Sequence, residues 1–464
     1  YGSTLALELL RIDPDGIRSS IIDGIAPVDY PDDFAAYGKI FTRALTQLQM
    51  ACNDDEACRD EFPDMAGDVR AAMSTVREAP VVIEDAIDPE AFPSGSATFF
   101  HDSIGGLAFI SLYGSRTYPN LPAMIAAAKA AAEEGSLDER MRFLTGMSGD
   151  VFGDFAEGMS IAVTCQLGWN DNAADARAAD VAAYPELSGI VSTDVLNKTP
   201  ELCREFGLLA RETTPLDTDV PTFIANGQID PITPPEFAEY ILPGFSQAQY
   251  IEVPYAGHGP TADDETCMSD VMRAFLDAPT DELDMTCLEE EIEAPAFVGP
   301  MWRTQGVTNV LADSFDEGKK GLLLGGLGAI STLGFVVLTL GGLARVANPS
   351  DYSVGADMGG GRTLTWLATA LVAGGLGTVA YGAYSLSETL PFALIFGLPG
   401  YTRWGAVALV VAALPALLAL FQLVRHLFAP RLPVGTFFGT LILNVAVVGV
   451  VAMAIMVGFA PWAG

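Results

Sequence analysis

Residues 220–259 read VPTFIANGQIDPITPPEFAEYILPGFSQAQYIEVPYAGHG. This stretch holds two short apolar runs, VPTFIANG and QYIEVPY, and a turn with one polar residue follows each of them. The first turn carries Asp230 and the second carries His258. Buried strands that deliver an acid and then a histidine supply the last two members of a triad in the chain order Ser, Asp, His. We therefore expect a nucleophile upstream of this stretch.

The start of the chain also has an α/β pattern. Residues 3–13, STLALELLRID, form an amphipathic pattern that Pro14 and Gly16 end, so we expect a helix there. Residues 17–24, IRSSIIDG, follow as a short β-branched strand. The sequence thus predicts an α/β core in two parts, residues 1–29 and residues 215–290, with strands at 220–226 and 248–253 and a closing helix at 264–277.

Between these two parts the apolar periodicity changes. Residues 30–214 are dominated by three- and four-residue spacing, as in DDFAAYGKIFTRALTQLQMA, PNLPAMIAAAKAAAEEG and DERMRFLTGMSGDVFGDFAEGMSIAVTC. Few strands are predicted here. We interpret this region as a helical insertion that forms a cap over the site of a partial α/β-hydrolase core.

Charge divides the chain into two very different parts. The 464 residues carry a net charge of -35, and 50% of them are hydrophobic. Residues 321–464 contain only three acidic and five arginine residues, so that part is near +2 and residues 1–320 hold the negative charge. Such acidity argues against nucleic acid as a partner, because like charge repels phosphate. A salty habitat is an alternative reason for the acidity.

Four apolar stretches follow a linker at residues 291–320: residues 321–344, 363–386, 404–424 and 436–459. Each reaches or exceeds the roughly 20 residues that span a bilayer, and none contains Asp, Glu, Lys or Arg. We therefore expect four transmembrane helices in residues 321–464, with the lipid bilayer as a partner. A transport path usually needs ionisable groups inside the membrane, so an anchoring or assembly role is preferred.

All six cysteines lie in the acidic part of the chain, at positions 52, 58, 165, 203, 267 and 287. An even number confined to one region suggests disulfides and an oxidising compartment. Six cysteines allow 15 connectivities. We favour the nearest-neighbour pairs Cys52–Cys58, Cys165–Cys203 and Cys267–Cys287, because each pair brackets one local loop or helix; buried free thiols are the alternative. Zinc is disfavoured, since no CxxC occurs and histidine is scarce, and no metal or other cofactor is predicted.

Membrane orientation follows from the cysteines and the arginines. If the cysteine-bearing region is outside the cell, the loops at 345–362 and 425–435 are cytoplasmic. They carry four arginines, against Lys319, Lys320 and Arg403 on the opposite side. The positive-inside bias is slight but in the right direction. We expect a multi-pass protein of the cell membrane whose folded domain lies on the periplasmic or extracellular side.

Three histidines are available as a base. His426 falls in a predicted cytoplasmic loop, and His101 lies early in the insertion without a partner pattern. A triad base follows the acid in the α/β-hydrolase order, which leaves His258. A lone GHG in a loop is often structural, but an aspartate in the turn after the preceding strand favours the catalytic interpretation. Asp230 would orient the imidazole and stabilise its charged form.

The segment YGSTLALELLRIDPDGIRSSIIDGIAPVD resembles the region after the nucleophile elbow in tripeptidyl aminopeptidase-like and proline iminopeptidase-like serine hydrolases. The similarity continues through MACNDDEACRDEFPDM, LYGSRTYPNLPAMIAAA, GMSIAVTC, ANGQIDPITPP, AGHG and CMSDVMRAFLDAPTDELDMTCL, and covers nearly all of residues 1–288. The resemblance implies that Asp230 is the acid and His258 the base. It also implies an exported domain with disulfides in this layout.

The resemblance places the nucleophilic serine immediately before Tyr1, so we expect this chain to be cut just after it and to be inactive alone. Tyr1 would supply one oxyanion-hole backbone N–H, as the residue after the nucleophile does in this fold. Ser3 is the alternative nucleophile. It falls two residues past the tyrosine of the elbow, where it would open the helix instead.

One departure concerns the substrate. Family aminopeptidases often carry a C-x-E pattern whose glutamate holds the amino terminus of the substrate, whereas this chain has Cys165-Gln166-Leu167. Glu157 or Asp154 could substitute, although a surface role is favoured for both. The expected function is a membrane-anchored serine peptidase acting on small peptides. The alternatives are an esterase of the same fold that takes an acyl substrate, and a catalytically dead domain used for binding or sensing. Nothing in the sequence indicates an oligomeric state.

Overall fold

The computed structural model describes residues 2–27, 30, 37–146, 156–166, 171–187, 201–208, 215–262, 267–290, 292–316, 318–347, 360–426 and 433–462. The chain divides into two compact units. Unit 1 comprises residues 1–82, 98–137 and 150–299, and unit 2 comprises residues 83–97, 138–149 and 300–464. Two short pieces of the predicted helical insertion therefore group with the C-terminal helices.

A three-stranded parallel sheet forms the centre of unit 1. Its order is β1 (Ser20–Asp23), β4 (Thr222–Gly227) and β5 (Ala248–Val253). The strands expected at 17–24, 220–226 and 248–253 are thus present. Asp23 pairs with Ala225 and Gly227 with Val253, so all three strands end at the same edge of the sheet. Side chains in the turns after these strands can therefore meet.

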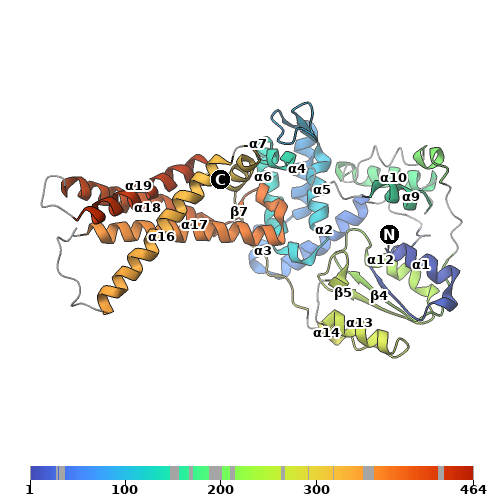
Figure 1. Ribbon diagram of the computed structural model, residues 1–464. Coiled ribbons are helices and arrows are strands. Elements are labelled where there is room, and N and C mark those ends of the chain that lie inside the picture. The colour runs from blue at the N-terminus through green and yellow to red at the C-terminus, as the bar shows by residue number, and fades with distance from the viewer. Residues whose placement is uncertain are drawn as a thin grey trace. The chain divides into compact units, whose positions relative to one another are not determined.

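Both faces of the sheet are covered by helices (Figure 1). Every residue of β4 is buried, and its side chains alternate between two apolar clusters, as a strand's period of two requires. Ile224 packs in a cluster with residues of α1 (Gly2–Ile12) and α12 (Pro235–Ile241). Phe223 packs on the opposite face in a cluster with residues of α13 (Cys267–Asp277). These layers fit the partial core of an α/β-hydrolase.

Helices dominate the insertion between β1 and β4, as the periodicity predicts. Two short strands that the sequence pattern did not indicate, β2 (Val81–Ile83) and β3 (Ala97–Phe99), pair within it. Its helices include α2 (Tyr37–Asp54), α3 (Glu56–Glu61), α4 (Met65–Glu78), α5 (His101–Ser111), α6 (Leu121–Glu133), α7 (Leu137–Met141), α9 (Glu157–Gln166) and α10 (Asp171–Ala183). Short 3-10 turns stand at Ser115–Asn120, Arg142–Gly146 and Pro185–Leu187.

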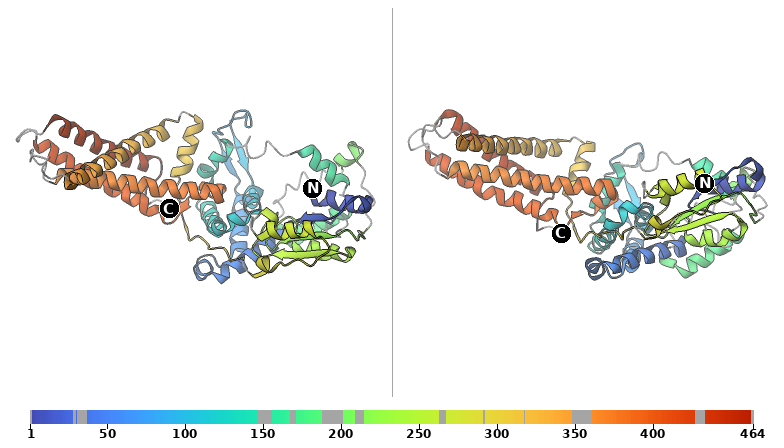
Figure 2. Two further views of the ribbon diagram at one scale, coloured as in Figure 1. Left: turned by 60° about the horizontal axis from the view of Figure 1, so that its bottom comes forward. Right: turned by 90° about the horizontal axis from the view of Figure 1, so that it is seen from below.

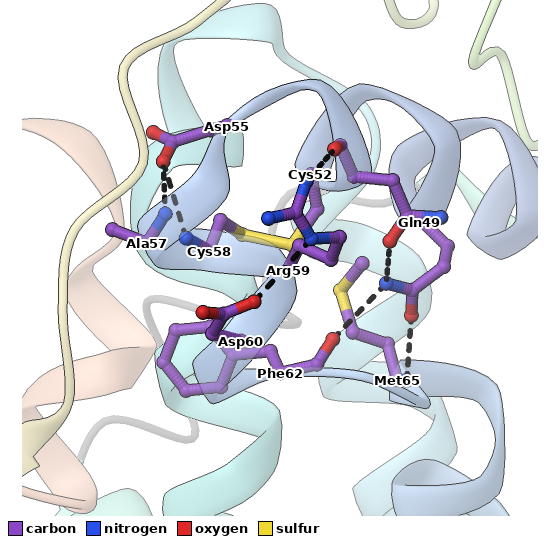
Figure 3. Close-up of a disulfide and its surroundings, with 10 residues drawn as sticks. Gln49, Cys52, Asp55, Ala57, Cys58, Arg59, Asp60, Phe62 and Met65 are labelled. Atoms are coloured by element: carbon purple, nitrogen blue, oxygen red, sulfur yellow. Dashed lines mark hydrogen bonds and ion pairs between the residues drawn. A yellow bond between two sulfur atoms is a disulfide. The ribbon is translucent and has the colours of Figure 1, made fainter.

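Three disulfides join the six cysteines in nearest-neighbour order, Cys52–Cys58, Cys165–Cys203 and Cys267–Cys287. Figure 3 shows the first of them, between the end of α2 and the short helix α3. The side chain of Asp55 caps α3 by accepting from the backbone N–H groups of Ala57 and Cys58. Gln49 accepts from the Met65 N–H and donates to the Phe62 carbonyl. The turn is therefore held by covalent and hydrogen bonds together.

Unit 2 contains the four long helices that the apolar stretches predict; they pack together, and α16 crosses the others obliquely (Figure 2). They are α16 (Lys319–Ala347), α17 (Gly361–Thr389), α18 (Thr402–His426) and α19 (Val434–Met456). Each is long and apolar enough to cross a membrane. The expected fourth stretch runs to Phe459, but α19 ends earlier, just before Gly458 adopts a positive φ of 107°. Single glycines of this kind often end helices.

Large apolar side chains on these four helices remain exposed, for example Leu333, Leu414 and Phe421. Lipid-facing side chains of a membrane bundle have this property. The interior of the bundle holds a strong polar group, Asn444, which is fully buried. Its amide nitrogen donates to Thr365 Oγ1 at 2.8 Å and to the Thr440 carbonyl at 2.7 Å. Asn444 therefore links α17 to α19.

Segments from the insertion complete unit 2. Arg140 in α7 is buried, and its guanidinium donates to the carbonyls of Phe396 and Arg303. Thr145 is also buried and accepts from the Ile87 N–H at 2.9 Å. The expected linker at 291–320 is not uniformly irregular: it includes β6 (Met301–Trp302), which pairs with β7 (Leu398–Pro399), and α15 (Gly306–Asp316).

Candidate active site

Asp230 lies in the turn that follows β4, and its side chain is fully buried. Its Oδ1 accepts from the backbone N–H groups of Ile232 and Thr233, at 2.7 and 2.9 Å. Its Oδ2 accepts from Thr233 Oγ1 at 2.6 Å. An aspartate commonly bonds to the backbone two residues ahead in this way, which fixes the turn and the carboxylate together. Burial without these donors would be costly.

His258 lies in the loop after β5, and its Nδ1 is 2.9 Å from Asp230 Oδ2. Thr233 Oγ1 is 3.1 Å from the same nitrogen. The backbone N–H of His258 donates to the Tyr113 carbonyl at 2.8 Å, and the Tyr113 ring packs edge-on to the imidazole with centroids 5.4 Å apart. With Nδ1 held by Asp230 and the side chain 31% exposed, Nε2 is the nitrogen left to exchange a proton with another group.

Opposing influences act on the imidazole. Burial lowers the pKa of His258, whereas the hydrogen bond to Asp230 and the charges of Asp230 and Asp23 raise it. The raising influences prevail, so the pKa of His258 lies above its ordinary value. This is the behaviour expected of an imidazole whose charged form is stabilised by a buried carboxylate.

Three glycines allow the backbone segments around Asp230 and His258 to approach one another closely, because a side chain on any of them would clash. A β-carbon on Gly24, which has a φ of 68°, would lie 2.7 Å from Thr233 Oγ1 and 3.2 Å from His258 Cε1. One on Gly257 would lie 2.4 Å from the Tyr113 carbonyl oxygen, and one on Gly227 would lie 2.0 Å from the Gly257 oxygen. The backbone of the histidine loop is thus packed directly between β4 and the end of α5.

Strain is also present in the turn that leads to the histidine. Tyr255 is the only non-glycine residue with positive φ among the described residues, at 56°. Its N–H donates to Gln228 Oε1 at 3.1 Å. A tyrosine in the left-handed region costs of order 1–3 kcal/mol, and such residues cluster at functional sites.

The structure therefore brings together the two residues that the sequence singled out, Asp230 and His258. Sequence reasoning missed Thr233, Gly24 and Tyr113. The ANGQIDPITPP motif contains Thr233 three residues after the acid, a spacing at which a hydroxyl can return to an aspartate. No local pattern marks Gly24 or Tyr113 as neighbours of the histidine.

Other residues considered from the sequence are placed elsewhere or lie outside the described residues. Tyr1, Asp154 and Leu167 lie outside them. Ser3 is in the first turn of α1, where a helix-opening role was expected. His101 opens α5, and burial, with the charge of Arg77, lowers its pKa. His426 ends α18 in unit 2.

The described residues contain no group of three or more His, Cys, Asp or Glu side chains that could hold a metal ion. The acid–imidazole pair is the cluster in this part of the chain that is arranged for proton transfer. It can accept a proton at Nε2, hold the resulting cation against a buried carboxylate, and return the proton later.

Comparison with known proteins gives one family match. Residues 194–287 match the profile of the family described as TAP-like protein, an α/β-hydrolase family. The matched region includes β4, β5 and the two turns that carry Asp230 and His258. No curated protein and no solved structure matches the chain. The match supports an α/β-hydrolase fold and, by family, hydrolase activity.

Proposed function

We propose that this chain carries the acid and base of a serine hydrolase that cleaves small peptides at the outer surface of a membrane. The observation that supports this most is the 2.9 Å contact between Asp230 Oδ2 and His258 Nδ1. The two residues follow adjacent parallel strands, in the order that an α/β-hydrolase requires. The match to a TAP-like family points to the same chemistry.

The reaction would be an acyl transfer. A serine hydroxyl attacks the carbonyl of the substrate while His258 Nε2 takes its proton, and the histidine then gives that proton to the leaving amine. Water repeats the sequence on the acyl-enzyme. Asp230 keeps the imidazole in the required tautomer and stabilises its cation. In this proposal the serine immediately precedes Tyr1 and the backbone N–H of Tyr1 helps to bind the oxyanion.

The serine is tested in the protein extended upstream of Tyr1. We expect the residue before Tyr1 to be serine and a fluorophosphonate probe to label it, because the probe reacts only with a hydroxyl activated by a base. The matched control replaces that serine by alanine and should not be labelled. Glycine, alanine or asparagine at this position, or a folded protein that is not labelled, would overturn the proposal in favour of a binding or sensing domain.

Substrate class is a separate question at the same site. Leu167 stands where aminopeptidases of the resembled families often have a glutamate that binds the substrate's amino terminus. A peptidase should release a fluorophore from short peptidyl amides, whereas an esterase should act on acyl esters alone. Hydrolysis of esters without amides would replace the peptidase assignment and leave the serine mechanism intact.

Membrane topology gives a prediction of its own. The three disulfides favour an oxidising location for unit 1, so residues 387–403 should face the same side and residues 345–362 the cytoplasm. Single cysteines introduced at Ser387 and at Ala347 should therefore react differently with an impermeant thiol reagent on intact cells. Labelling of the Ala347 variant but not the Ser387 variant would reverse the orientation.

A further inference from the structure

A second carboxylate lies beside the candidate site, on a different strand from Asp230. Asp23 is the last residue of β1 and pairs in register with Ala225 of β4. Its Oδ2 accepts from the backbone N–H of Thr261 at 3.3 Å and also from Thr261 Oγ1. Thr261 follows His258 by three residues. Asp23 thus holds the loop three residues beyond the histidine, whereas Asp230 contacts the ring itself.

The environment of Asp23 is poor for a carboxylate. Its Oδ1 is buried and has no hydrogen-bond partner among the described residues. Burial raises the pKa of Asp23, and the charge of Asp230 adds to this; the hydrogen bonds from Thr261 and the charge of His258 oppose it. A buried oxygen without a donor destabilises the charged form. Among the described residues, His258 is the group whose positive charge favours an ionised Asp23.

The backbone around Asp23 leaves no side chain between it and the histidine loop. Gly24 follows it, and a β-carbon there would lie 3.2 Å from His258 Cε1. Gly259, with a φ of 82°, follows His258, and a β-carbon there would lie 3.8 Å from Asp23 Oδ2. The end of β1 therefore approaches the imidazole through two glycines. In a partly buried site of this kind, charges interact more strongly than in water.

We propose that Asp23 is a positioning residue for His258: it fixes the histidine loop through Thr261 and adds a second negative charge that favours the imidazolium. Asp230 contacts the ring itself, whereas Asp23 acts through the loop and through its field. The consequence for catalysis rests on the proposed function, because the imidazolium becomes a reaction intermediate only if the site performs acyl transfer. The effect of Asp23 on protonation of the His258 ring does not depend on the proposed function.

Titration of the His258 imidazole tests whether the charge of Asp23 stabilises the imidazolium. The charged and titratable groups that face the ring among the described residues are Asp230, Asp23 and the Tyr113 phenol. The chain has three histidines, so ¹³C-labelled histidine gives three NMR signals, and the one lost in His258→Gln belongs to His258. In Asp23→Asn the isosteric amide keeps an acceptor for Thr261 but removes the charge. The midpoint of His258 should fall, since the imidazolium then loses its proton at a lower pH.

The matched control is Asp15→Asn, which makes the same charge change on an exposed residue of the same segment. It should leave the midpoint unchanged, because exposed charges are strongly screened. A midpoint in Asp23→Asn equal to that of the control would overturn the proposal and leave Asp23 with a purely structural role.

A second pair of variants tests the link to the loop and still decides the matter if Asp23→Asn fails to fold. Thr261→Val removes the hydroxyl donor, so the charge on Asp23 becomes harder to maintain and the His258 midpoint should also fall. Thr261→Ser keeps the hydroxyl and should restore the wild-type midpoint. Identical titrations for Thr261→Val and the wild type would refute the proposed link between Asp23 and the histidine loop through Thr261.

Activity measurements separate this proposal from the proposed function. In the upstream-extended protein, the acid limb of kcat/KM should move to lower pH in Asp23→Asn but not in Asp15→Asn. If that protein is inactive, the serine-hydrolase proposal fails, while the NMR titration still accepts or rejects the role of Asp23.

Discussion

Replacing His258 by alanine is expected to abolish fluorophosphonate labelling and peptide hydrolysis in the upstream-extended protein. The imidazole is the only group placed to accept the proton of a serine while Asp230 holds its other nitrogen at 2.9 Å, among the residues that the structure describes. Loss of a triad base costs about 10⁴-fold or more in kcat, because the hydroxyl is then a poor nucleophile. Rates of probe labelling and of peptidyl amide hydrolysis measure this directly.

Two further variants serve as a control and as a second test of the proposed acid–base pair. His101→Ala removes a histidine from the start of α5 and should retain wild-type rates. Asp230→Asn should lower kcat by about 10⁴-fold, since an amide in that place favours the wrong tautomer of the histidine. Wild-type hydrolysis by His258→Ala would show that another group is the base.

Replacing Gly257 by alanine is expected to destabilise the protein strongly, because the added methyl group would meet backbone atoms beside the site. The added carbon would lie 2.4 Å from the Tyr113 carbonyl oxygen and 2.7 Å from that of Leu112. Backbone atoms at the end of α5 cannot move aside as a flexible side chain can, so we expect a cost of about 1–3 kcal/mol in the free energy of unfolding. Displacement of the loop should also break the hydrogen bond from the His258 N–H to Tyr113.

The measurement is the unfolding free energy of the full chain in detergent, together with the rate of probe labelling in the extended protein. Gly106→Ala is the matched control, because it adds the same methyl group within α5 at a position where nothing lies within 4 Å. It should be neutral or slightly stabilising, since alanine favours a helix over glycine. A Gly257→Ala protein as stable as the control would show that the loop is not tightly packed.

Local patterns in the sequence predicted much of this architecture. The strand at 220–226 is visible as a short apolar run because every residue of β4 is buried, and a strand buried on both faces must be apolar throughout. The strand at 248–253 is less buried and includes Gln249 and Glu252. Four long apolar stretches without acidic or basic residues predicted four helices, and the structure contains four helices long and apolar enough to cross a membrane. Both results depend on residues that are neighbours along the chain, and the energy of transfer from water to an apolar environment determines them.

The candidate site could be predicted only in part. Asp230 and His258 were identified because a polar residue in the turn after each strand is a local signal, and parallel strands end at one edge. Their supporting groups carry no such signal. Asp23 precedes His258 by more than two hundred residues, and Tyr113 follows the end of helix α5 in the insertion.

The sequence by itself predicted the three strands of the central sheet, the helical character of the insertion, the four long apolar helices, and Asp230 and His258 as the candidate acid and base. Only the tertiary structure decided that Thr233 contacts both Asp230 and His258, that Asp23 holds the histidine loop through Thr261, and that residues 83–97 and 138–149 group with the C-terminal helices. The physical reason is that hydrophobic periodicity records which face of an element leaves water, not which distant element it meets. Close packing then selects the partners, and in the histidine loop it does so through glycines whose hydrogen atoms leave room for them.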